Sequence, residues 1–535
     1  MSRCTAPKRG HRSERARRDC PVCGSLPPRR QIPPFPQISH SARVRGLAHP
    51  SQPSRSSSSS IKQIQLGTQA SISGIFTVDL AISRTQWAAG AGFFHSCTIN
   101  TNNRRFTFVY DCGTARKFSV LQREIDLFLK SINSSWQDPI YKKRNFTFFG
   151  TPFKDEWNTS NPAPTPTIDT VFISHFDTDH IKGLGYLIQK AKVKELVIPY
   201  TTPEERFLYL AASQQTPSSA TDRTDDTTID TFTVNFTANP KDAVNELYQE
   251  MKIDRRETRV VIVSSNAQNG RAAYTTQITM NTNSPSTNQH SKSQNVPVWT
   301  IAAHTLTNNA NSYGHKLINE LINRGIISTK DDLTNPHTLK RIFSTQNSIS
   351  EITKAYRTIV GRNLNKTSLL LYSGPSRPLD TQTSDHIFWT ERPTGNTSTN
   401  TFSFPILDCD FPYQAGWLGC GDAPLSSTTN LSTFDSIFGD YKLFASTFAP
   451  PHHGSLNDWN IQLLDSFGYP DEIRPVCVIS ADGLHRHPDP YVISDIYSSG
   501  SISFIVTTDK RSRLTETMGS VIGCKQFSCS GDAVR

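Results

Sequence analysis

Four side chains that can bind metal ions lie close together near residue 175. They are His175, Asp177, Asp179 and His180. Imidazole and carboxylate together suit a divalent first-row metal such as zinc or manganese. A lone His-x-Asp would be interpreted as a solvated acidic loop with an incidental histidine. The complete His-x-Asp-x-Asp-His string instead predicts a metal-binding loop.

The flanking residues predict that this cluster lies on a loop between a strand and a helix. The apolar run from Thr170 to Ile173 indicates a short buried strand that ends at Ser174. After the cluster, apolar residues recur at helical spacing at Ile181, Leu184, Leu187 and Ile188. A loop of this kind can direct several side chains toward one point, so we expect the four ligands to converge.

The string resembles the His-x-His-x-Asp-His signature of the metallo-β-lactamase superfamily, with Asp177 in place of the second histidine. The same substitution makes it similar to the hydrolase domain of the competence protein ComEC and its relatives. The resemblance implies an α/β fold, the four-layer αββα sandwich. It also implies a hydrolase that uses a metal-activated water.

Two aspartates elsewhere in the chain resemble further parts of that site. Asp111 follows a strand-like run at 106–110, and the resemblance implies that its carboxylate braces the ligand loop by hydrogen bonds. Gly421-Asp422 follows another apolar run and resembles the position whose aspartate bridges two metal ions. A carboxylate suits that role because each of its oxygens can hold one ion.

Histidines near the C-terminus are expected to complete the ligand set. The string at 452–455 resembles the His-His-Gly-Ser of the ComEC-like group. Adjacent residues at a strand end point to opposite sides, so we expect only one of the two to face the metals. We favour His452 as the ligand without excluding His453, and the other could donate a proton to the leaving group. His487 resembles the closing His-Pro ligand, while His304 is either a ligand or an ordinary loop histidine.

These parts together imply a site with two divalent metal ions, zinc or manganese. Such ions lower the pKa of a bound water to about 7, and by analogy with the family Asp179 both contacts a metal and orients the hydroxide. The extra carboxylate of Asp177 favours phosphate esters. We therefore expect a phosphodiesterase or nuclease acting on DNA, RNA or a nucleotide. The alternatives are a hydrolase of a small ester or thioester, and a non-catalytic interaction module.

Strands and helices predicted along the chain agree with the implied sandwich. Helical patterns cover residues 118–132 and much of 316–360. Strand patterns occur at residues 72–80, 106–110, 170–173, 194–199, 231–236, 259–263, 299–304, 366–372, 443–449, 476–480 and 503–508. We place the hydrolase domain at 71–535, with polar insertions around 200–300, including 281–295, and around 375–405.

The charge of the chain is concentrated at its N-terminus. Residues 1–62 contain thirteen Lys and Arg but only two acidic residues, whereas the whole chain has a net charge of +10. The remainder is therefore close to neutral, which argues against tight general binding of duplex DNA. The Pro-, Ser- and Arg-rich segment 1–70 is predicted to be disordered.

The sequence gives a few further expectations about compartment and cysteines. It has no apolar run long enough for a signal peptide or a membrane span, so we expect a cytoplasmic protein without membrane contact. The ten cysteines show no regular framework, which favours reduced thiols. Cys20 and Cys23 have no second pair at zinc-finger spacing. The oligomeric state stays open.

Overall fold

The computed structural model describes most of the chain from residue 80 to residue 520. The described residues are 80–101, 104–137, 165–213, 230–252, 258–265, 272–282, 294–306, 311–359, 367–376, 384–390, 400–403, 415–465, 467 and 474–520. The segment 1–70 predicted to be disordered, the boundary at residue 71 and the Cys20–Cys23 pair all lie outside the described residues. So does the strand predicted at 72–80, except for its last residue.

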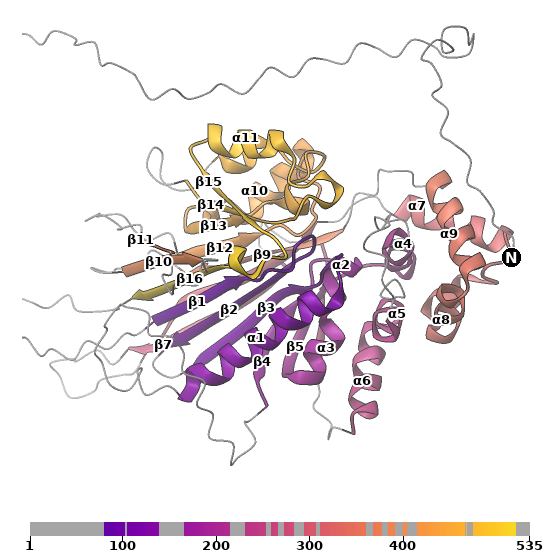
Figure 1. The fold of residues 1–535 in the computed structure, drawn as a ribbon, viewed down its shortest axis with the longest axis horizontal. Coiled ribbons are helices and arrows are strands. Elements are labelled where there is room, and N and C mark those ends of the chain that lie inside the picture. Colours follow the sequence, from indigo (N-terminus) through magenta and orange to yellow (C-terminus); the bar gives the residue numbers. More distant parts are fainter. Residues whose placement is uncertain are drawn as a thin grey trace, which may run out of the picture. The chain divides into compact units, whose positions relative to one another are not determined.

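Two β-sheets form the centre of the domain (Figure 1). The larger has the strand order β11 (Asn400–Ser403), β10 (Ser384–Thr390), β16 (Leu514–Ser520), β1 (Leu80–Gln86), β2 (Phe94–Thr101), β3 (Arg105–Cys112), β4 (Thr167–Phe172), β5 (Lys192–Pro199), β6 (Arg259–Val263). The smaller has the order β15 (Ile502–Val506), β14 (Val476–Ser480), β13 (Ala445–Ala449), β12 (Gly416–Gly419), β9 (Ser368–Pro375), β8 (Gln294–Leu306), β7 (Tyr274–Thr282).

The two sheets pack face to face through large apolar side chains. Phe108 and Phe172 of the nine-stranded sheet belong to the same buried cluster as Trp299 and Trp417 of the seven-stranded sheet. Alternate residues of each strand point into this layer, and their neighbours point outward. Both faces of β9 and β14 are buried, which explains the nearly continuous apolar sequences of these two strands.

Helices cover the outer face of each sheet. Three of them, α1 (Phe118–Gln137), α3 (Leu184–Lys190) and α6 (Pro240–Glu250), pack on the nine-stranded sheet through a second apolar cluster. On the seven-stranded sheet, α10 (Thr428–Lys442) and α11 (Pro490–Ser498) pack through a third. The layers are therefore helix, sheet, sheet and helix, and the predicted four-layer αββα sandwich is confirmed.

A group of helices between β5 and β9 has an apolar core of its own. It comprises α4 (Pro203–Ser213), α5 (Thr231–Ala238), α7 (Asn311–Asn323), η2 (Lys330–Thr334), α8 (Pro336–Ser344) and α9 (Gln346–Ile359). Tyr209 of α4 connects this group to the sandwich, because its hydroxyl accepts a hydrogen bond from the backbone N–H of Thr367 at 2.9 Å. The helical patterns predicted within 316–360 are confirmed.

The prediction of a strand at 231–236 is wrong, because these residues form helix α5. Asp230 begins the helix by accepting a hydrogen bond from the backbone N–H of Thr233 at 2.9 Å. The β-branched and aromatic residues of the segment favour a strand by intrinsic propensity. Two different apolar clusters bury opposite sides of the helix, through Val234 and Phe236, and this packing overrides the propensity.

Some segments predicted as insertions carry strands of the two sheets. β7 and β8 are antiparallel partners whose last pairs join Asn281 to Asn295 and Thr282 to Gln294. The residues between these pairs lie outside the described part of the chain. In the 375–405 region, β10 and β11 form an antiparallel pair at the edge of the nine-stranded sheet. Strand β2 and helix α10 were not predicted.

No helix in the described part of the chain is both long and apolar enough to span a membrane.

Gly113 allows the turn after β3 to approach the loop that follows β4. A Cβ atom at this position would lie 2.2 Å from the carbonyl carbon of Asp179, so the two backbones fit only without a side chain. We expect Gly113→Ala to lower the free energy of unfolding by about 2 kcal/mol or more, because backbone atoms must move. Urea unfolding measures this change.

Gly439→Ala is the matched control for that substitution. Gly439 lies inside α10, and no atom is within 4 Å of the Cβ position. Because alanine is more favourable than glycine inside a helix, the free energy of unfolding of this variant should rise by about 0.5 kcal/mol. Equal effects of the two substitutions would contradict the close approach of the two loops.

Candidate metal centre

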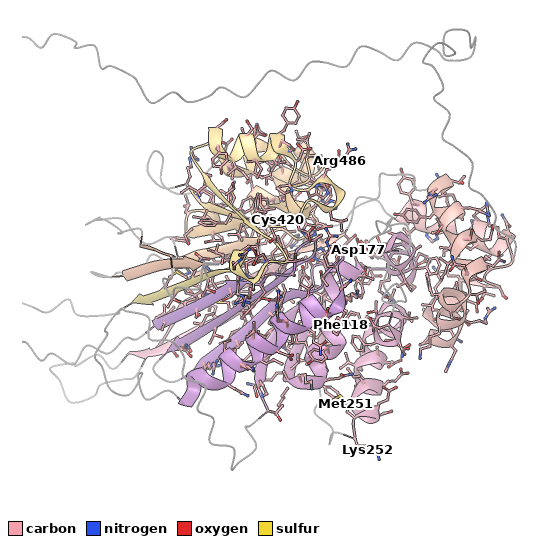
Figure 2. All side chains as sticks on the ribbon, viewed as in Figure 1. Phe118, Asp177, Met251, Lys252, Cys420 and Arg486 are labelled. Atoms are coloured by element: carbon pink, nitrogen blue, oxygen red, sulfur yellow. The ribbon has the colours of Figure 1, made fainter. Side chains whose placement is uncertain are left out.

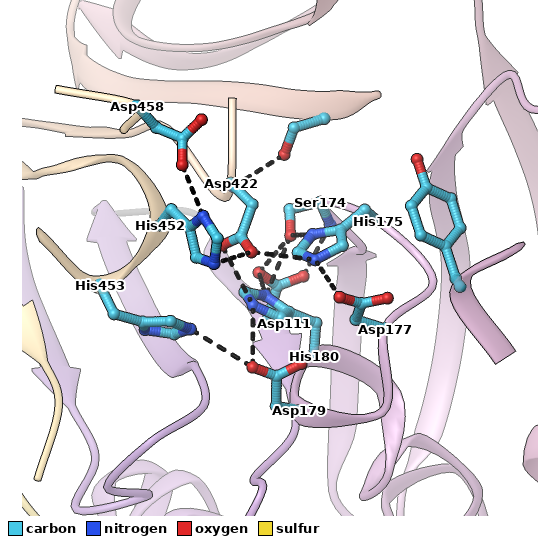
Figure 3. A network of polar contacts seen from close by, with 12 residues as sticks. Asp111, Ser174, His175, Asp177, Asp179, His180, Asp422, His452, His453 and Asp458 are labelled. Carbon is cyan, nitrogen blue, oxygen red and sulfur yellow. Dashed lines mark hydrogen bonds and ion pairs between the residues drawn. The ribbon is translucent and has the colours of Figure 1, made fainter. Parts of the chain in front are cut away.

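Loops at the ends of several strands bring the predicted ligands together (Figure 3). His175 follows β4, and Asp179 and His180 belong to the short helix α2 (Thr178–Ile181). From the other sheet, Asp422 follows β12, and His452 follows β13 in the turn η3 (Pro451–Gly454). Both sheets therefore contribute to the site from residues that are far apart in the sequence.

The carboxylate of Asp422 lies between imidazoles on two sides. Its Oδ1 is 3.4 Å from Nε2 of His180, whereas its Oδ2 is 3.5 Å from Nε2 of His175. Nε2 of His452 also lies 3.4 Å from Oδ2. His175, His180 and Asp422 are buried and form one of the groups whose ligand atoms lie within 4.8 Å of one another.

The other two aspartates of the loop extend the cluster in two directions. Oδ2 of Asp177 is 3.7 Å from Nε2 of His175. Oδ2 of Asp179 is 3.8 Å from Nε2 of His180 and 3.4 Å from Nε2 of His453. Two further groups of potential ligands result, one formed by His175, Asp177 and Asp179, and one by Asp179, His180 and His453.

These separations fit ligands that share a cation better than they fit direct hydrogen bonds. Two atoms that each lie about 2.1 Å from one tetrahedral ion are about 3.4 Å apart, whereas N–H···O hydrogen bonds are about 2.9 Å long. Nε2 of His175, His180 and His453 is buried and makes no hydrogen bond within the described residues. The donors present therefore fit a divalent metal.

Asp111 holds the ligand loop in the way expected from the sequence. Its Oδ1 accepts a hydrogen bond from the backbone N–H of Ser174 at 2.6 Å, and its Oδ2 accepts one from the Ser174 hydroxyl at 2.6 Å. Oδ2 also lies 2.8 Å from Nδ1 of His180. A proton on Nδ1 leaves the lone pair of Nε2 directed toward Asp422, as a metal ligand requires.

The electrostatic environment of His180 is strongly anionic. Burial lowers the pKa of His180, but the carboxylates of Asp111, Asp179 and Asp422 outweigh this effect and hold it well above its ordinary value. Without a cation, the folded protein therefore favours the imidazolium form. A bound metal would replace that proton.

The expectation that only one of His452 and His453 faces the metals rests on strand geometry, which the structure contradicts. Both residues have left-handed backbone conformations, with φ of 47° and 53°. The alternation of side chains along a strand does not apply there. Both Nε2 atoms approach carboxylates of the cluster, His452 at Asp422 and His453 at Asp179.

His304, His487 and His452 are all absent from the ligand groups found among the described residues, but Nε2 of His452 lies 3.4 Å from Oδ2 of Asp422. His304 lies within β8, and burial lowers its pKa to about 4. The ring of His487 lies 5.3 Å from that of His452, at one side of the cluster.

Two residues of the site, Asp458 and Ser174, were not predicted from the sequence. Asp458 lies 2.6 Å from Nδ1 of His452, so it orients this ring as Asp111 orients His180. Ser174 connects Asp111 to the loop, and its hydroxyl also lies 2.9 Å from Nδ1 of His175. A serine directly before the first histidine was a usable signal, whereas Asp458 gave none.

Residues 150–247 match the family model of the metallo-beta-lactamase superfamily. The chain has a metallo-β-lactamase fold. The match covers the ligand loop, while Asp111, Asp422 and the 452–453 histidines lie outside it and are joined to the loop by the structure. A comparison with curated proteins found no match.

The superfamily match indicates a metal-dependent hydrolase, and the His and Asp groups of the metallo-β-lactamase fold are suited to bind divalent metals such as zinc. The matched model describes the superfamily as a whole, so the closer resemblance to the ComEC hydrolase domain stays a prediction.

Replacing Asp111 should destabilise the metal-free protein in a pH-dependent way. Because the pKa of His180 is raised on folding, its stabilising contribution is complete below its ordinary value of 6.5 and is lost as the pH rises through the folded value. Asp111→Asn should therefore lower the free energy of unfolding by about 3 kcal/mol near pH 6, and by clearly less in alkaline solution.

Chemical unfolding of the chelator-treated protein at both pH values measures this difference. Asp440→Asn, at an exposed position of α10, is the matched control and should have little effect at either pH. An equal loss for Asp111→Asn at both pH values would show that the carboxylate of Asp111 does not stabilise a protonated His180.

Proposed function

We propose that this protein is a dinuclear metal hydrolase that cleaves phosphodiester bonds in DNA, RNA or a nucleotide. The observation that supports it is the position of Asp422, whose two oxygens approach different histidines. A carboxylate placed in this way is suited to bridge two ions a few ångströms apart.

The contacts divide into two ligand sets around that bridge. Around Oδ2 of Asp422 lie Nε2 of His175, Nε2 of His452 and, next to His175, the carboxylate of Asp177. Nε2 of His180 lies near Oδ1 of Asp422. The carboxylate of Asp179 lies between His180 and His453 and contacts both. Each set thus offers two imidazoles and two carboxylates, which is enough for a four-coordinate ion.

We propose both His452 and His453 as ligands, in place of a ligand and a proton donor. His452 has its other ring nitrogen on Asp458, which fixes the direction of Nε2. His453 is buried, and its Nε2 makes no hydrogen bond within the described residues. His487, whose ring lies 5.3 Å from that of His452, stays a further candidate ligand.

Divalent ions in this site would lower the pKa of a bound water to about 7 and stabilise the charge that develops on the substrate. The protein fixes where that chemistry happens. Asp179 is the most exposed of the three ligand carboxylates, with 23% of its side chain accessible, against 10% for Asp177 and 1% for Asp422. It is therefore suited to hold and orient the attacking water on the open side.

Charge supports an anionic substrate. Two divalent ions bring four positive charges, whereas the proposed ligands include only three carboxylates, from Asp177, Asp179 and Asp422. That excess is a single charge, which a metal-bound hydroxide would cancel, so the attraction for a phosphodiester would come from the ions themselves, which can bind its oxygens directly. Hard oxygen ligands in each set favour zinc or manganese over softer metals.

Metal content tests the dinuclear centre directly. We expect about two zinc or manganese ions per chain in the purified protein by elemental analysis. In Asp422→Ala the content should fall to one or none, because both sets lose an oxygen. Asp440→Ala, which removes an exposed carboxylate from α10, should leave the content unchanged. A full metal content in Asp422→Ala would exclude the bridging role.

A substrate screen tests the reaction. The metal-loaded protein should hydrolyse bis-p-nitrophenyl phosphate and single-stranded DNA, and Asp179→Ala should lower the rate on the order of 1,000-fold. Turnover of a thioester alone would support the small-ester alternative. A protein that purifies without metal and turns over none of these compounds would support a non-catalytic module.

A further inference from the structure

We propose that Arg486, Tyr491 and Leu456 form a rim that binds the nucleotide next to the scissile bond in single-stranded nucleic acid. This inference rests on the proposed function, because it names the substrate of the same site. It uses surface residues to which the metal centre gives no role.

The rim is physically continuous with the turn η3, which carries His452 and His453. The backbone N–H of Asp489 donates to the carbonyl of Gly454 at 2.9 Å, so the 486–491 segment is attached to the turn that carries His452 and His453. A Cβ at Gly454 would lie 3.0 Å from Cβ of Pro488. Leu456 and Tyr491 each lie two residues from this junction, within about 10 Å of it at 3.8 Å per residue.

Arg486 supplies a cation that no other residue in the described part of the chain neutralises. Its side chain is exposed, and it forms no ion pair with any other described residue. Figure 2 shows it at the same end of the sheets as Asp177 of the ligand loop. Its neighbour His487 packs against His452. An unpaired guanidinium in this place is suited to bind a phosphate that flanks the reacting one.

The backbone at Arg486 is held in an unfavourable conformation. Its φ is 65°, a left-handed value. This conformation is unfavourable in free energy for residues other than glycine. Three of the other four residues with positive φ, apart from glycines, lie in the metal centre, namely Asp111, His452 and His453. Arg486 therefore belongs with the strained positions of the site, although it contributes no ligand atom.

Two large apolar side chains near the junction of Gly454 and Asp489 are exposed to solvent. Tyr491 is 71% exposed, and Leu456 is 45% exposed. Asp489 caps α11 by accepting from the backbone N–H of Tyr491 at 2.9 Å, which fixes the backbone of the tyrosine at the start of the helix. Exposed aromatic rings are what unpaired bases stack on.

An aromatic ring, an apolar side chain and a free cation match a nucleotide better than they match a small ester. The ring and the leucine bind the base, and the guanidinium binds its phosphate. Bases of a duplex are already stacked and paired, so the rim favours single strands. The near-neutral charge of residues 63–535 also fits a substrate that is bound by stacking and not mainly by phosphate contacts.

Direct binding tests the rim independently of catalysis. Fluorescence anisotropy is measured for the metal-loaded full chain with labelled phosphorothioate strands of about 15 nucleotides, as oligothymidine and as oligouridine. Tyr491→Ala should weaken binding about tenfold, and Tyr491→Phe, which keeps the ring, should restore it. Arg486→Gln should reduce the slope of log Kd against log salt by about 0.7.

Tyr497→Ala is the matched control, because Tyr497 is also on α11 and 60% exposed but lies at the far end of the helix, with its hydroxyl near Ser503. It should leave the Kd unchanged. Equal losses for the two tyrosines, no loss for Tyr491→Ala, or tighter binding of a duplex of the same length would overturn the proposal.

Turnover of bis-p-nitrophenyl phosphate by the wild-type protein separates this inference from the proposed function. If binding depends on Tyr491 but the diester is not cleaved, the rim stands and the proposed hydrolysis fails. If the diester is cleaved but binding does not depend on Tyr491, the hydrolysis stands and the rim is wrong.

Discussion

Three carboxylates and four imidazoles meet at the junction of the two sheets in this protein, mostly out of contact with water. Burying carboxylates costs several kilocalories per mole each unless a cation or a set of hydrogen bonds compensates. Part of that compensation is internal, because Asp111 and Asp458 bind the Nδ1 atoms of His180 and His452. Nε2 of His175, His180 and His453 makes no hydrogen bond within the described residues, and a bound cation would offset the remaining cost. Every other feature of the site follows from the need to hold these groups together.

The sandwich supplies that convergence by bringing two sheets to one junction. Asp111 lies near the end of β3, and His175 follows β4. These strands are parallel neighbours, so both residues lie at the same end of the nine-stranded sheet. Asp422 and His452 follow β12 and β13, which are parallel neighbours in the other sheet. The close approach of Gly113 to Asp179 then fixes how deep the ligand loop lies. Long polar segments can be inserted elsewhere without moving these strand ends.

The sequence was most informative where function is local. His175, Asp177, Asp179 and His180 lie in one short loop, so residue types and spacing alone predict them as a unit. Asp422 was recognisable because Gly-Asp follows an apolar strand. The arrangement of His452 and His453 could not be recognised from the sequence, because both residues have a left-handed backbone, where side chains do not alternate as they do along a strand. Asp458 reaches His452 because the chain turns back over residues 455–458, which the sequence pattern does not indicate. The segment at 231–236 shows the same limit for the fold, since packing on two sides turned a strand-like pattern into a helix.

Anomalous X-ray diffraction from crystals of the metal-loaded protein, recorded at the zinc or manganese edge, would locate the ions that Asp422 is proposed to bridge. We expect two peaks about 3.5–4 Å apart, one beside Oδ1 of Asp422 near His180 and one beside Oδ2 near His175. A single peak, or peaks that do not contact Asp422, would contradict the shared carboxylate and with it the proposed division of the ligands into two sets.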